Sequence, residues 1–262
     1  MGKRALIGLL IVAVWLLAAA CTSFAPAVDL DVIDSTGANG TVLRSGFSEA
    51  TGLNYILTHP SPGGEPLPLI VFLHSLEERG DRLAPVLENP AGQGLGLSRI
   101  ASSVAEDHPL TRFATLSPLC PAGTYWHMVR GRLFALIDEI AHRRDVNTDQ
   151  VIVTGVSMGG MGAWSLGMAE PQRFTAIVPI AGGVYSPPMR ARFDRLVDTP
   201  MWVVHDRLDP SIELERDAWA VERVREAGGS VRFTITDEAR HYVHEEFYHG
   251  HALYEWLLAL PS

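Results

Sequence analysis

The clearest chemical signal in the sequence is the run Gly155-Val156-Ser157-Met158-Gly159. An apolar stretch over 150–154 precedes this run, and a helix-compatible stretch over 160–170 follows it. A serine on so tight a strand-to-helix turn needs small residues two positions before and after it, and the turn exposes its hydroxyl above the sheet edge. The pattern therefore predicts Ser157 as the nucleophile of an acyl transfer and the backbone N–H of Met158 as a donor to the oxyanion. The alternative is a glycine-rich turn whose serine is inert.

A second group of reactive side chains lies near the C-terminus, where residues 241–251 include four histidines. Two glutamates directly after His244 suggest a zinc site. The string H-E-x-x-H is not formed, however, because Tyr248 occupies the fourth position after His244 and His249 comes one residue later. On a helix, His244 and His249 would point in different directions. We therefore predict no metal and no organic cofactor, and one catalytic histidine among several exposed ones.

The elements that would position these residues follow an alternating pattern from about residue 41. After a hairpin-like start, β-type runs are predicted at 53–58, 69–74, 113–117, 150–154, 176–180, 201–205 and 231–236. Several runs are continuously apolar, which is typical of strands buried on both faces of a parallel sheet. Helical patterns are predicted at 133–140, 160–170, 220–227 and 251–260. The order predicts an α/β fold with a mostly parallel central sheet and helices on both faces.

The N-terminus has the pattern of an export signal. Lys3 and Arg4 precede an apolar run over 5–20, which ends in small residues directly before Cys21. Residues 1–20 are therefore predicted to be a signal peptide, with Cys21 as the lipidated first residue of the mature protein. Cleavage of an ordinary signal nearby is the alternative, and a transmembrane anchor is less favoured because the run is shorter than the roughly 20 residues of a bilayer span.

These patterns divide the chain into the signal peptide, a tether over 21–40 rich in small and polar residues, and one catalytic domain over 41–262. The expected location is the bacterial cell envelope, with the lipid as the membrane anchor. The net charge of −9 argues against a nucleic-acid partner, which would require a basic face. The second cysteine, Cys120, is predicted to be a small buried hydrophobe, since no motif activates it.

Residues 145–160, DVNTDQVIVTGVSMGG, resemble the α/β-hydrolase superfamily, as do PQRF at 171–174 and PIAGG at 179–183. The closest similarity is to the secreted esterase and predicted-peptidase branch related to feruloyl esterases and polyhydroxybutyrate depolymerases. It extends from about Gly46 to the C-terminus. The resemblance implies a serine hydrolase that cleaves carboxylic esters through a Ser-His-Asp triad and an acyl-enzyme intermediate. A small-molecule or polymer-linked ester would be the substrate.

The same resemblance suggests the acid and the base of the triad. Residues 206–210, DRLDP, resemble the end of the superfamily motif H-G-x-x-D-P, so Asp209 takes the acid position, with Asp206 as the competitor. His241 lies where the branch carries its catalytic histidine after the last strand, with His244 as the competitor. The chain order of serine, acid and histidine agrees with that of the superfamily.

The loop that lends the second oxyanion donor is matched by residues 68–79, PLIVFLHSLEER, which makes the backbone N–H of Leu76 the implied donor. Ser75 and Glu77 replace two glycines of the usual loop, and Arg240 replaces a glycine before the histidine. The histidine of this loop, His74, is expected to be structural. The departures at Ser75 and Arg240 favour an alternative in which the chain is a non-catalytic lipoprotein that uses the fold as a binding scaffold.

The substrate side of the site is less specified. Trp126 and Tyr185 are candidates for the walls of the substrate pocket, with core packing as the alternative for Trp126. The nineteen residues 181–199 are too few for a bulky helical cap, so we expect no large cap domain and an open cleft. The motifs do not separate an ester from an amide substrate, and a serine peptidase of the same fold is a further alternative.

Overall fold

The computed structural model describes residues 34–60, 64–83, 96–142, 145–184 and 192–261. Within these ranges the chain folds around a single sheet with the strand order β1-β2-β3-β5-β4-β6-β7-β8-β9. The strands are β1 Asp34–Thr36, β2 Val42–Ser48, β3 Leu53–His59, β4 Leu67–Leu73, β5 Ala114–Pro118, β6 Val146–Val156, β7 Ala176–Ile180, β8 Met201–Asp206 and β9 Val231–Thr236. The first three strands pair antiparallel and the other six are parallel to one another.

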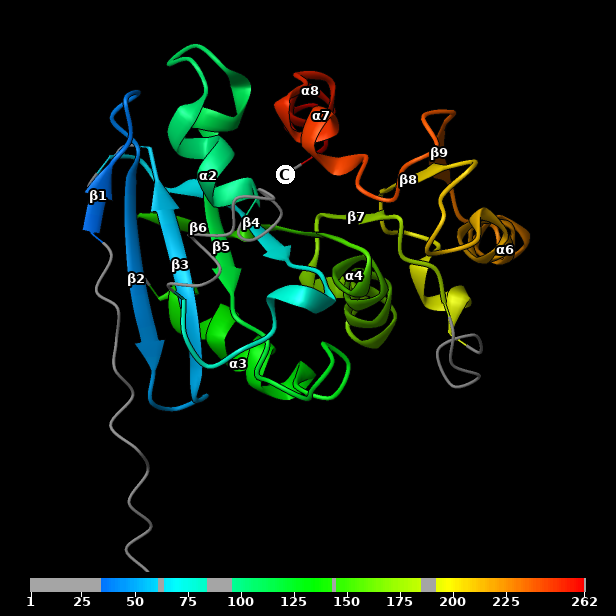
Figure 1. The fold of residues 1–262 in the computed structure, drawn as a ribbon, viewed down its shortest axis with the longest axis horizontal. Helices are drawn as coiled ribbons and strands as arrows, with labels where there is room; N and C mark the ends of the chain where they lie inside the picture. Colours follow the sequence, from blue (N-terminus) through cyan, green and yellow to red (C-terminus); the bar gives the residue numbers. More distant parts are fainter. Residues whose placement is uncertain (1–33, 61–63, 84–95, 143–144, 185–191, 262) are drawn as a thin grey trace, which may run out of the picture.

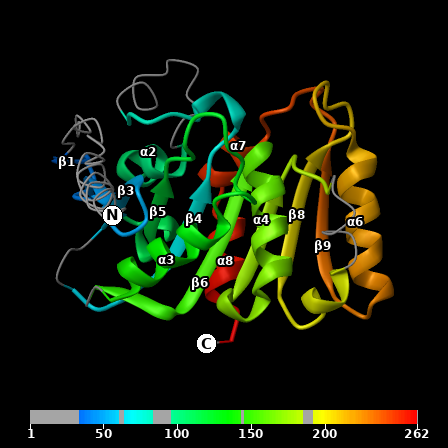
Figure 2. The ribbon, with the colours of Figure 1, turned by 90° about the horizontal axis from the view of Figure 1, so that it is seen from below.

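Helices cover both faces of the sheet (Figures 1 and 2). The main helices are α2 Gly96–Ser103, α3 Arg130–Ala141, α4 Met158–Ala169, α6 Leu214–Glu226, α7 His244–His249 and α8 Ala252–Leu258. Short 3-10 turns are η1 Leu76–Glu78, η2 Pro109–Arg112, η3 Pro171–Arg173 and η4 Phe193–Leu196. One buried cluster joins the sheet to α3, α4 and α6, and a second joins it to α2, α7 and α8. The expected three-layer α/β architecture is confirmed.

Strand β4 shows why several strands are apolar throughout. Along this strand Val71 belongs to the α3–α4–α6 cluster, while its neighbours Ile70 and Phe72 belong to the α2–α7–α8 cluster. Successive side chains of a strand point to opposite faces, so a strand covered on both sides buries every position. The continuous apolar pattern is therefore a consequence of the two helical layers.

Several elements differ from those expected. Asp34–Thr36, inside the expected tether, is a strand that pairs with β2. Strand β2, VLRSGFS, carries polar residues and is only partly buried, which weakens its signal in the sequence. Helices α2 and α7 were not expected, the latter because it has only six residues, HEEFYH. Cys21 and Tyr185 lie outside the described residues.

The connection between β7 and β8 contains, in its described part, only the turn η4. This agrees with the absence of a large cap that the length of the segment predicted. No helix in the described part of the chain has the length and apolar character that crossing a bilayer requires.

Candidate active site

The predicted nucleophile, acid and base all follow the carboxyl ends of parallel strands. Backbone hydrogen bonds join the carboxyl ends of neighbouring strands. Ser157 N donates to Ile180 O at 3.0 Å, Ala181 N to Val204 O at 2.9 Å, and Arg207 N to Thr236 O at 2.8 Å. Ser157 directly follows β6, Asp209 lies just after β8, and His241 lies just after β9. The topology therefore brings the three segments to one edge of the sheet, which we call the carboxyl edge.

Ser157 has the backbone of a strained turn. Its φ is 58° and its ψ is −119°, a conformation that residues with a Cβ rarely adopt. Such a backbone costs of order 1–3 kcal/mol and is found mostly at functional sites. The flanking glycines are sterically required, because a Cβ on Gly159 would lie 1.8 Å from the carbonyl oxygen of Leu73 and one on Gly155 would lie 2.5 Å from the same atom.

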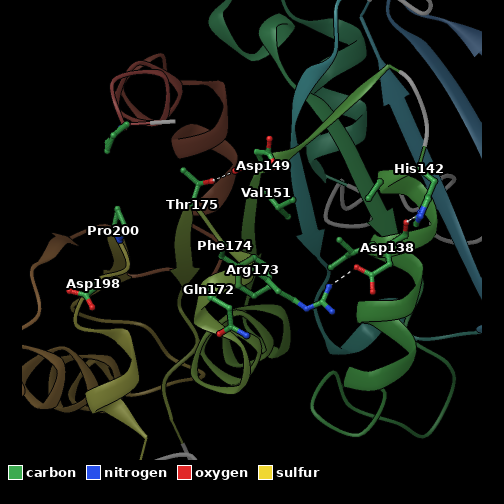
Figure 3. Close-up of a pocket in the computed structure, with 13 residues that line it drawn as sticks. Asp138, His142, Asp149, Val151, Gln172, Arg173, Phe174, Thr175, Asp198 and Pro200 are labelled. Carbon is green, nitrogen blue, oxygen red and sulfur yellow. Dashed lines mark hydrogen bonds and ion pairs between the residues drawn. The ribbon is translucent and has the colours of Figure 1, made fainter.

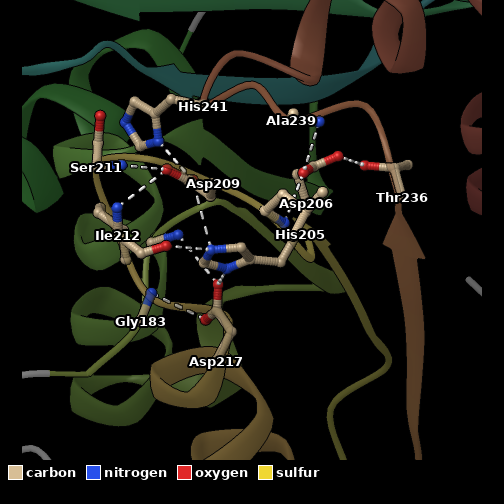
Figure 4. Close-up of polar contacts among 12 residues, drawn as sticks. Gly183, His205, Asp206, Asp209, Ser211, Ile212, Asp217, Thr236, Ala239 and His241 are labelled. Carbon is tan, nitrogen blue, oxygen red and sulfur yellow. Dashed lines mark hydrogen bonds and ion pairs between the residues drawn. The ribbon is translucent and has the colours of Figure 1, made fainter.

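Asp209 and His241 are in direct contact (Figure 4). The Asp209 Oδ2 to His241 Nδ1 distance is 2.6 Å, and the Asp209 side chain is fully buried. The other carboxylate oxygen accepts hydrogen bonds from Ser211 N at 2.7 Å and Ile212 N at 3.0 Å. Since a carboxylate only accepts hydrogen bonds, Nδ1 of His241 carries the proton and donates it, which leaves the lone pair of the neutral ring on Nε2. The predicted acid and base are thus brought together.

The competing acid, Asp206, has a different task. It accepts hydrogen bonds from Thr236 Oγ1 at 2.7 Å, Glu238 N at 2.6 Å and Ala239 N at 3.1 Å. Burial raises the pKa of Asp206, but these bonds and one from Leu208 N outweigh burial and leave the pKa lowered. Asp206 therefore holds the turn that leads from β9 to the histidine segment.

The competing base, His244, makes no hydrogen bond through either ring nitrogen to the residues that the structure describes. The side chain is buried at the start of α7 and contacts the rings of Tyr242 and Tyr248 edge-on. Burial lowers the pKa of His244 to about 3, with further lowering by the charge of His241. The described residues contain no group of three or more histidine, cysteine, aspartate or glutamate side chains placed to hold a metal.

The predicted oxyanion loop begins where β4 ends. Leu76 is the first residue of η1 and Met158 is the first residue of α4, so the backbone N–H of each lacks an acceptor within its own helix. The two helix starts are neighbours, because Gly159 packs on the carbonyls of Leu73 and His74. Both predicted donors thus lie at the carboxyl edge beside Ser157.

The replacement of glycine by Ser75 does not strain this loop. Ser75 has φ −79° and ψ −176°, an extended backbone that any residue adopts. Its N–H donates to Glu78 Oε2 at 2.7 Å and its hydroxyl to Glu77 Oε2 at 2.9 Å. Glu77 also accepts a hydrogen bond from the Tyr242 hydroxyl at 3.2 Å, which ties the loop to the residue after His241. The other departure, Arg240, is a surface residue paired with Glu238 and Glu246.

His74 and Trp126 support the loop from below. His74 Nδ1 donates to Ser75 O at 2.7 Å, and Nε2 accepts from Cys120 N at 2.9 Å. Burial lowers the pKa of His74 to about 4, consistent with a neutral, structural ring as expected. Trp126 donates to His74 O at 3.0 Å and is 1% exposed. It offers a substrate almost no surface, so the core-packing alternative describes Trp126 and the predicted pocket wall is wrong. Cys120 is a buried free thiol, as expected.

The phospholipase/carboxylesterase family matches residues 130–250. A thermostable esterase of known structure is 25% identical, with a TM-score of 0.63, over 84% of this chain and 62% of that one. An S-formylglutathione hydrolase from Agrobacterium tumefaciens is 18% identical, with a TM-score of 0.61, over 86% and 97% of the two chains. A ferulic acid esterase is 15% identical, with a TM-score of 0.59, over 83% and 98%. No curated protein sequence matches this chain.

The chain has the α/β-hydrolase fold. The expected resemblance to the esterase branch of the α/β-hydrolase superfamily is confirmed, since the matching family is a phospholipase/carboxylesterase family and the similar structures include a thermostable esterase and a ferulic acid esterase. The chain spans 62% of the length of the thermostable esterase.

Two polar residues of this α/β-hydrolase escaped the sequence analysis, although they lie behind Asp209. His205, in β8, and Asp217, in α6, are both fully buried and lie 2.7 Å apart. Each interrupts an apolar surface: His205 follows four apolar residues of β8, and Asp217 shares the buried face of α6 with Ala220, Val221 and Val224. A polar residue on an apolar face was the signal available in the sequence.

A pocket of about 670 Å³ lies at the opposite end of the sheet (Figure 3). It is lined at the starts of β6, β7 and β8, where Asp149, Thr175 and Pro200 are located. Arg173 on its wall pairs with Asp138 at 2.5 Å. This amino edge is separated from Ser157, Asp209 and His241 by the length of the strands.

Proposed function

We propose that this α/β-hydrolase is a serine hydrolase of carboxylic esters that works through Ser157, His241 and Asp209 and an acyl-enzyme. The observation that carries the proposal is the 2.6 Å contact between buried Asp209 and His241, at the sheet edge where Ser157 has its strained backbone. A buried carboxylate that orients an imidazole whose other nitrogen is free to accept a proton is the arrangement a hydroxyl nucleophile requires.

In the proposed reaction, the Ser157 hydroxyl attacks the acyl carbon of the ester while Nε2 of His241 takes its proton. The imidazolium that forms is stabilised by the carboxylate of Asp209, which the backbone N–H groups of Ser211 and Ile212 hold in place. His241 then returns the proton to the leaving alcohol, which departs as the serine ester forms.

The negative charge that develops on the carbonyl oxygen would be stabilised by the N–H groups of Leu76 and Met158. Donors fixed in place before the reaction stabilise the transition state without reorganisation, and the loss of one such donor typically lowers kcat by about 10²–10³-fold. Water activated by His241 would then attack the acyl-enzyme and release the acid. Each step uses groups of this chain.

The substrate is proposed to be a small-molecule or polymer-linked ester that reaches an open site. Leu76 and Leu208, which adjoin the oxyanion loop and the acid, are both exposed and apolar. They suit an acyl or alcohol group with apolar character. Lipidation of Cys21 and export to the cell envelope remain predictions from the leader alone.

Hydrolysis of p-nitrophenyl acetate and p-nitrophenyl butyrate by the purified chain tests this proposal. We expect turnover by the wild type and a loss of about 10³-fold or more in Ser157→Ala, because the nucleophile is removed. Equal turnover by the two proteins would refute the assignment. A wild type that cleaves peptides but neither ester would favour the peptidase alternative. A wild type that cleaves neither esters nor peptides would favour the binding scaffold.

A further inference from the structure

His205 lies between two buried aspartates. Its Nδ1 is 2.7 Å from Asp217 Oδ2, and its Nε2 is 2.9 Å from Ile212 O and 3.4 Å from Asp209 Oδ2. The three side chains have no exposed surface. Figure 4 shows the resulting line of contacts, which runs from Asp217 through His205 and Asp209 to His241.

The contacts of Asp217 require its ionised form. Its Oδ1 accepts from Trp164 Nε1 at 2.7 Å and Gly183 N at 2.9 Å, and its Oδ2 accepts from Gly182 N at 3.0 Å. Indole and backbone N–H groups are donors only. With His205 as a further partner, the carboxylate has four donors on its two oxygens, which is the full acceptor capacity of the charged form.

The contacts of His205 require a proton on both ring nitrogens. Ile212 O can only accept, so Nε2 carries a hydrogen. Asp217 already accepts from three N–H donors, which favours a carboxylate that only accepts, and beside it Nδ1 also carries a hydrogen and donates it to Oδ2. A ring with both nitrogens protonated is an imidazolium.

We propose that His205 is a buried imidazolium, held by Asp217, that acts as a positioning residue for the catalytic carboxylate of Asp209. This inference rests on the proposed function. A fixed positive charge 3.4 Å from Asp209 Oδ2 attracts that carboxylate and holds it in line with His241. The charge thus acts on the reaction through Asp209 and does not touch the substrate.

The titration of His205 agrees with this arrangement. Burial lowers its pKa, but the hydrogen bond and charge of Asp217, with Ile212 O and Asp209, outweigh burial and leave the pKa raised. The charged or titratable groups in contact with the ring are Asp217 from α6 and Asp209 from the loop after β8. Both are acidic, so both favour the cation.

The charge is tested directly by nitrogen NMR on wild-type protein with ¹⁵N-labelled histidine, with the His205 signals assigned by their loss in His205→Gln. At pH 7.5 we expect both ring nitrogens of His205 to carry a proton, and only one to do so in Asp217→Asn. A wild-type ring with a single proton at pH 7.5 would overturn the proposal. This readout needs no activity, so it decides the inference even if the chain hydrolyses no ester.

The positioning role is tested by the pH dependence of ester hydrolysis. In Asp217→Asn we expect kcat to fall by about 10- to 100-fold with KM nearly unchanged, because misalignment of the triad affects the chemical step. The acidic limb of the kcat profile should differ from that of the wild type, because the charge beside Asp209 is lost, and Asp217→Glu should recover part of the loss. If Asp217→Asn folds and has the same kcat and the same acidic limb as the wild type, the positioning role is overturned. A wild type without esterase activity would instead overturn the proposed function.

A matched control is His108→Asn. His108 is also a buried histidine, but its ring nitrogens bond to the backbone of Leu110 and His249, at the amino edge before β5. We expect its kcat and pH profile to match those of the wild type. If Asp217→Asn does not fold, the wild-type NMR result and the Asp217→Glu profile decide the proposal.

Discussion

The two edges of the sheet carry different kinds of structure. The carboxyl edge holds a serine at φ 58°, a contact between buried Asp209 and His241, and a buried histidine between two carboxylates. The amino edge holds the pocket of about 670 Å³, with relaxed backbone on its walls and the partly exposed pair Arg173–Asp138. Strain and buried charge destabilise the fold, so they are retained where a reaction needs them. The strained backbone and the buried charges, rather than the size of the pocket, therefore favour the carboxyl edge as the site of the proposed reaction.

The largest expected effect separates the two edges by activity. Asp209→Asn should lower kcat by about 10⁴-fold, because an amide at this position no longer selects the productive tautomer of His241. Arg173→Ala, on the wall of the amino-edge pocket, should leave kcat/KM within about twofold, since surface substitutions remote from a site have small effects. Steady-state kinetics on p-nitrophenyl butyrate measure both. A collapse of activity in Arg173→Ala with little change in Asp209→Asn would reverse the comparison.

A smaller effect concerns the steric limits at the carboxyl edge. Gly159→Ala would place a Cβ 1.8 Å from Leu73 O, so it should destabilise the fold by about 1–3 kcal/mol or more. Gly131→Ala, in α3, meets no atom within 4 Å and should stabilise the fold by about 0.5–1 kcal/mol through helix propensity. Urea denaturation monitored by circular dichroism gives both values. Equal midpoints for the two variants would show that the nucleophile turn has room to relax.

The smallest effect tests the charge state of His244, a buried histidine that lies outside the line of contacts from Asp217 to His241. The pKa of His244 is about 3 in the folded state and near 6.5 when unfolded, so the unfolded chain binds an extra proton as the pH falls below 6.5. The contribution of His244 to the free energy of unfolding is therefore fully present above pH 6.5, and it is lower by about 2 kcal/mol at pH 5.

His244→Leu removes this titration. Because the imidazole has no hydrogen-bond partner in the described part of the chain, the variant should match the wild type at pH 7.5 to within about 1 kcal/mol, and it should be the more stable protein at pH 5. Denaturation at the two pH values measures the difference. Parallel losses of stability in the two proteins would show that His244 is not held neutral.

Much of the fold was predictable because its strongest elements carry local signals. Strands β7 and β9 have the predicted bounds, since each is a β-rich run between turn residues. Strand β2 and helix α7 were missed for physical reasons. The first is half-exposed and mixed in polarity, and the second is too short to show a helical period.

The site was predictable to the extent that its residues lie in local motifs. The contact between Asp209 and His241 was implied by a family resemblance, while spacing alone left Asp206 and His244 open. The structure separates these candidates by their partners, which come from distant segments. His205 and Asp217 were missed because their contact forms only when β8 and α6 pack together. No sequence motif links two such residues twelve positions apart.

The most direct test of the account is labelling of the folded protein with a fluorophosphonate probe, followed by mass spectrometry of its peptides. We expect one label per chain on Ser157 and no label in Ser157→Ala. In His241→Ala we expect much slower labelling, because the Ser157 hydroxyl has lost the base that takes its proton. Labelling at any other residue, or equal rates in wild type and His241→Ala, would contradict the claim that Ser157 is an activated nucleophile.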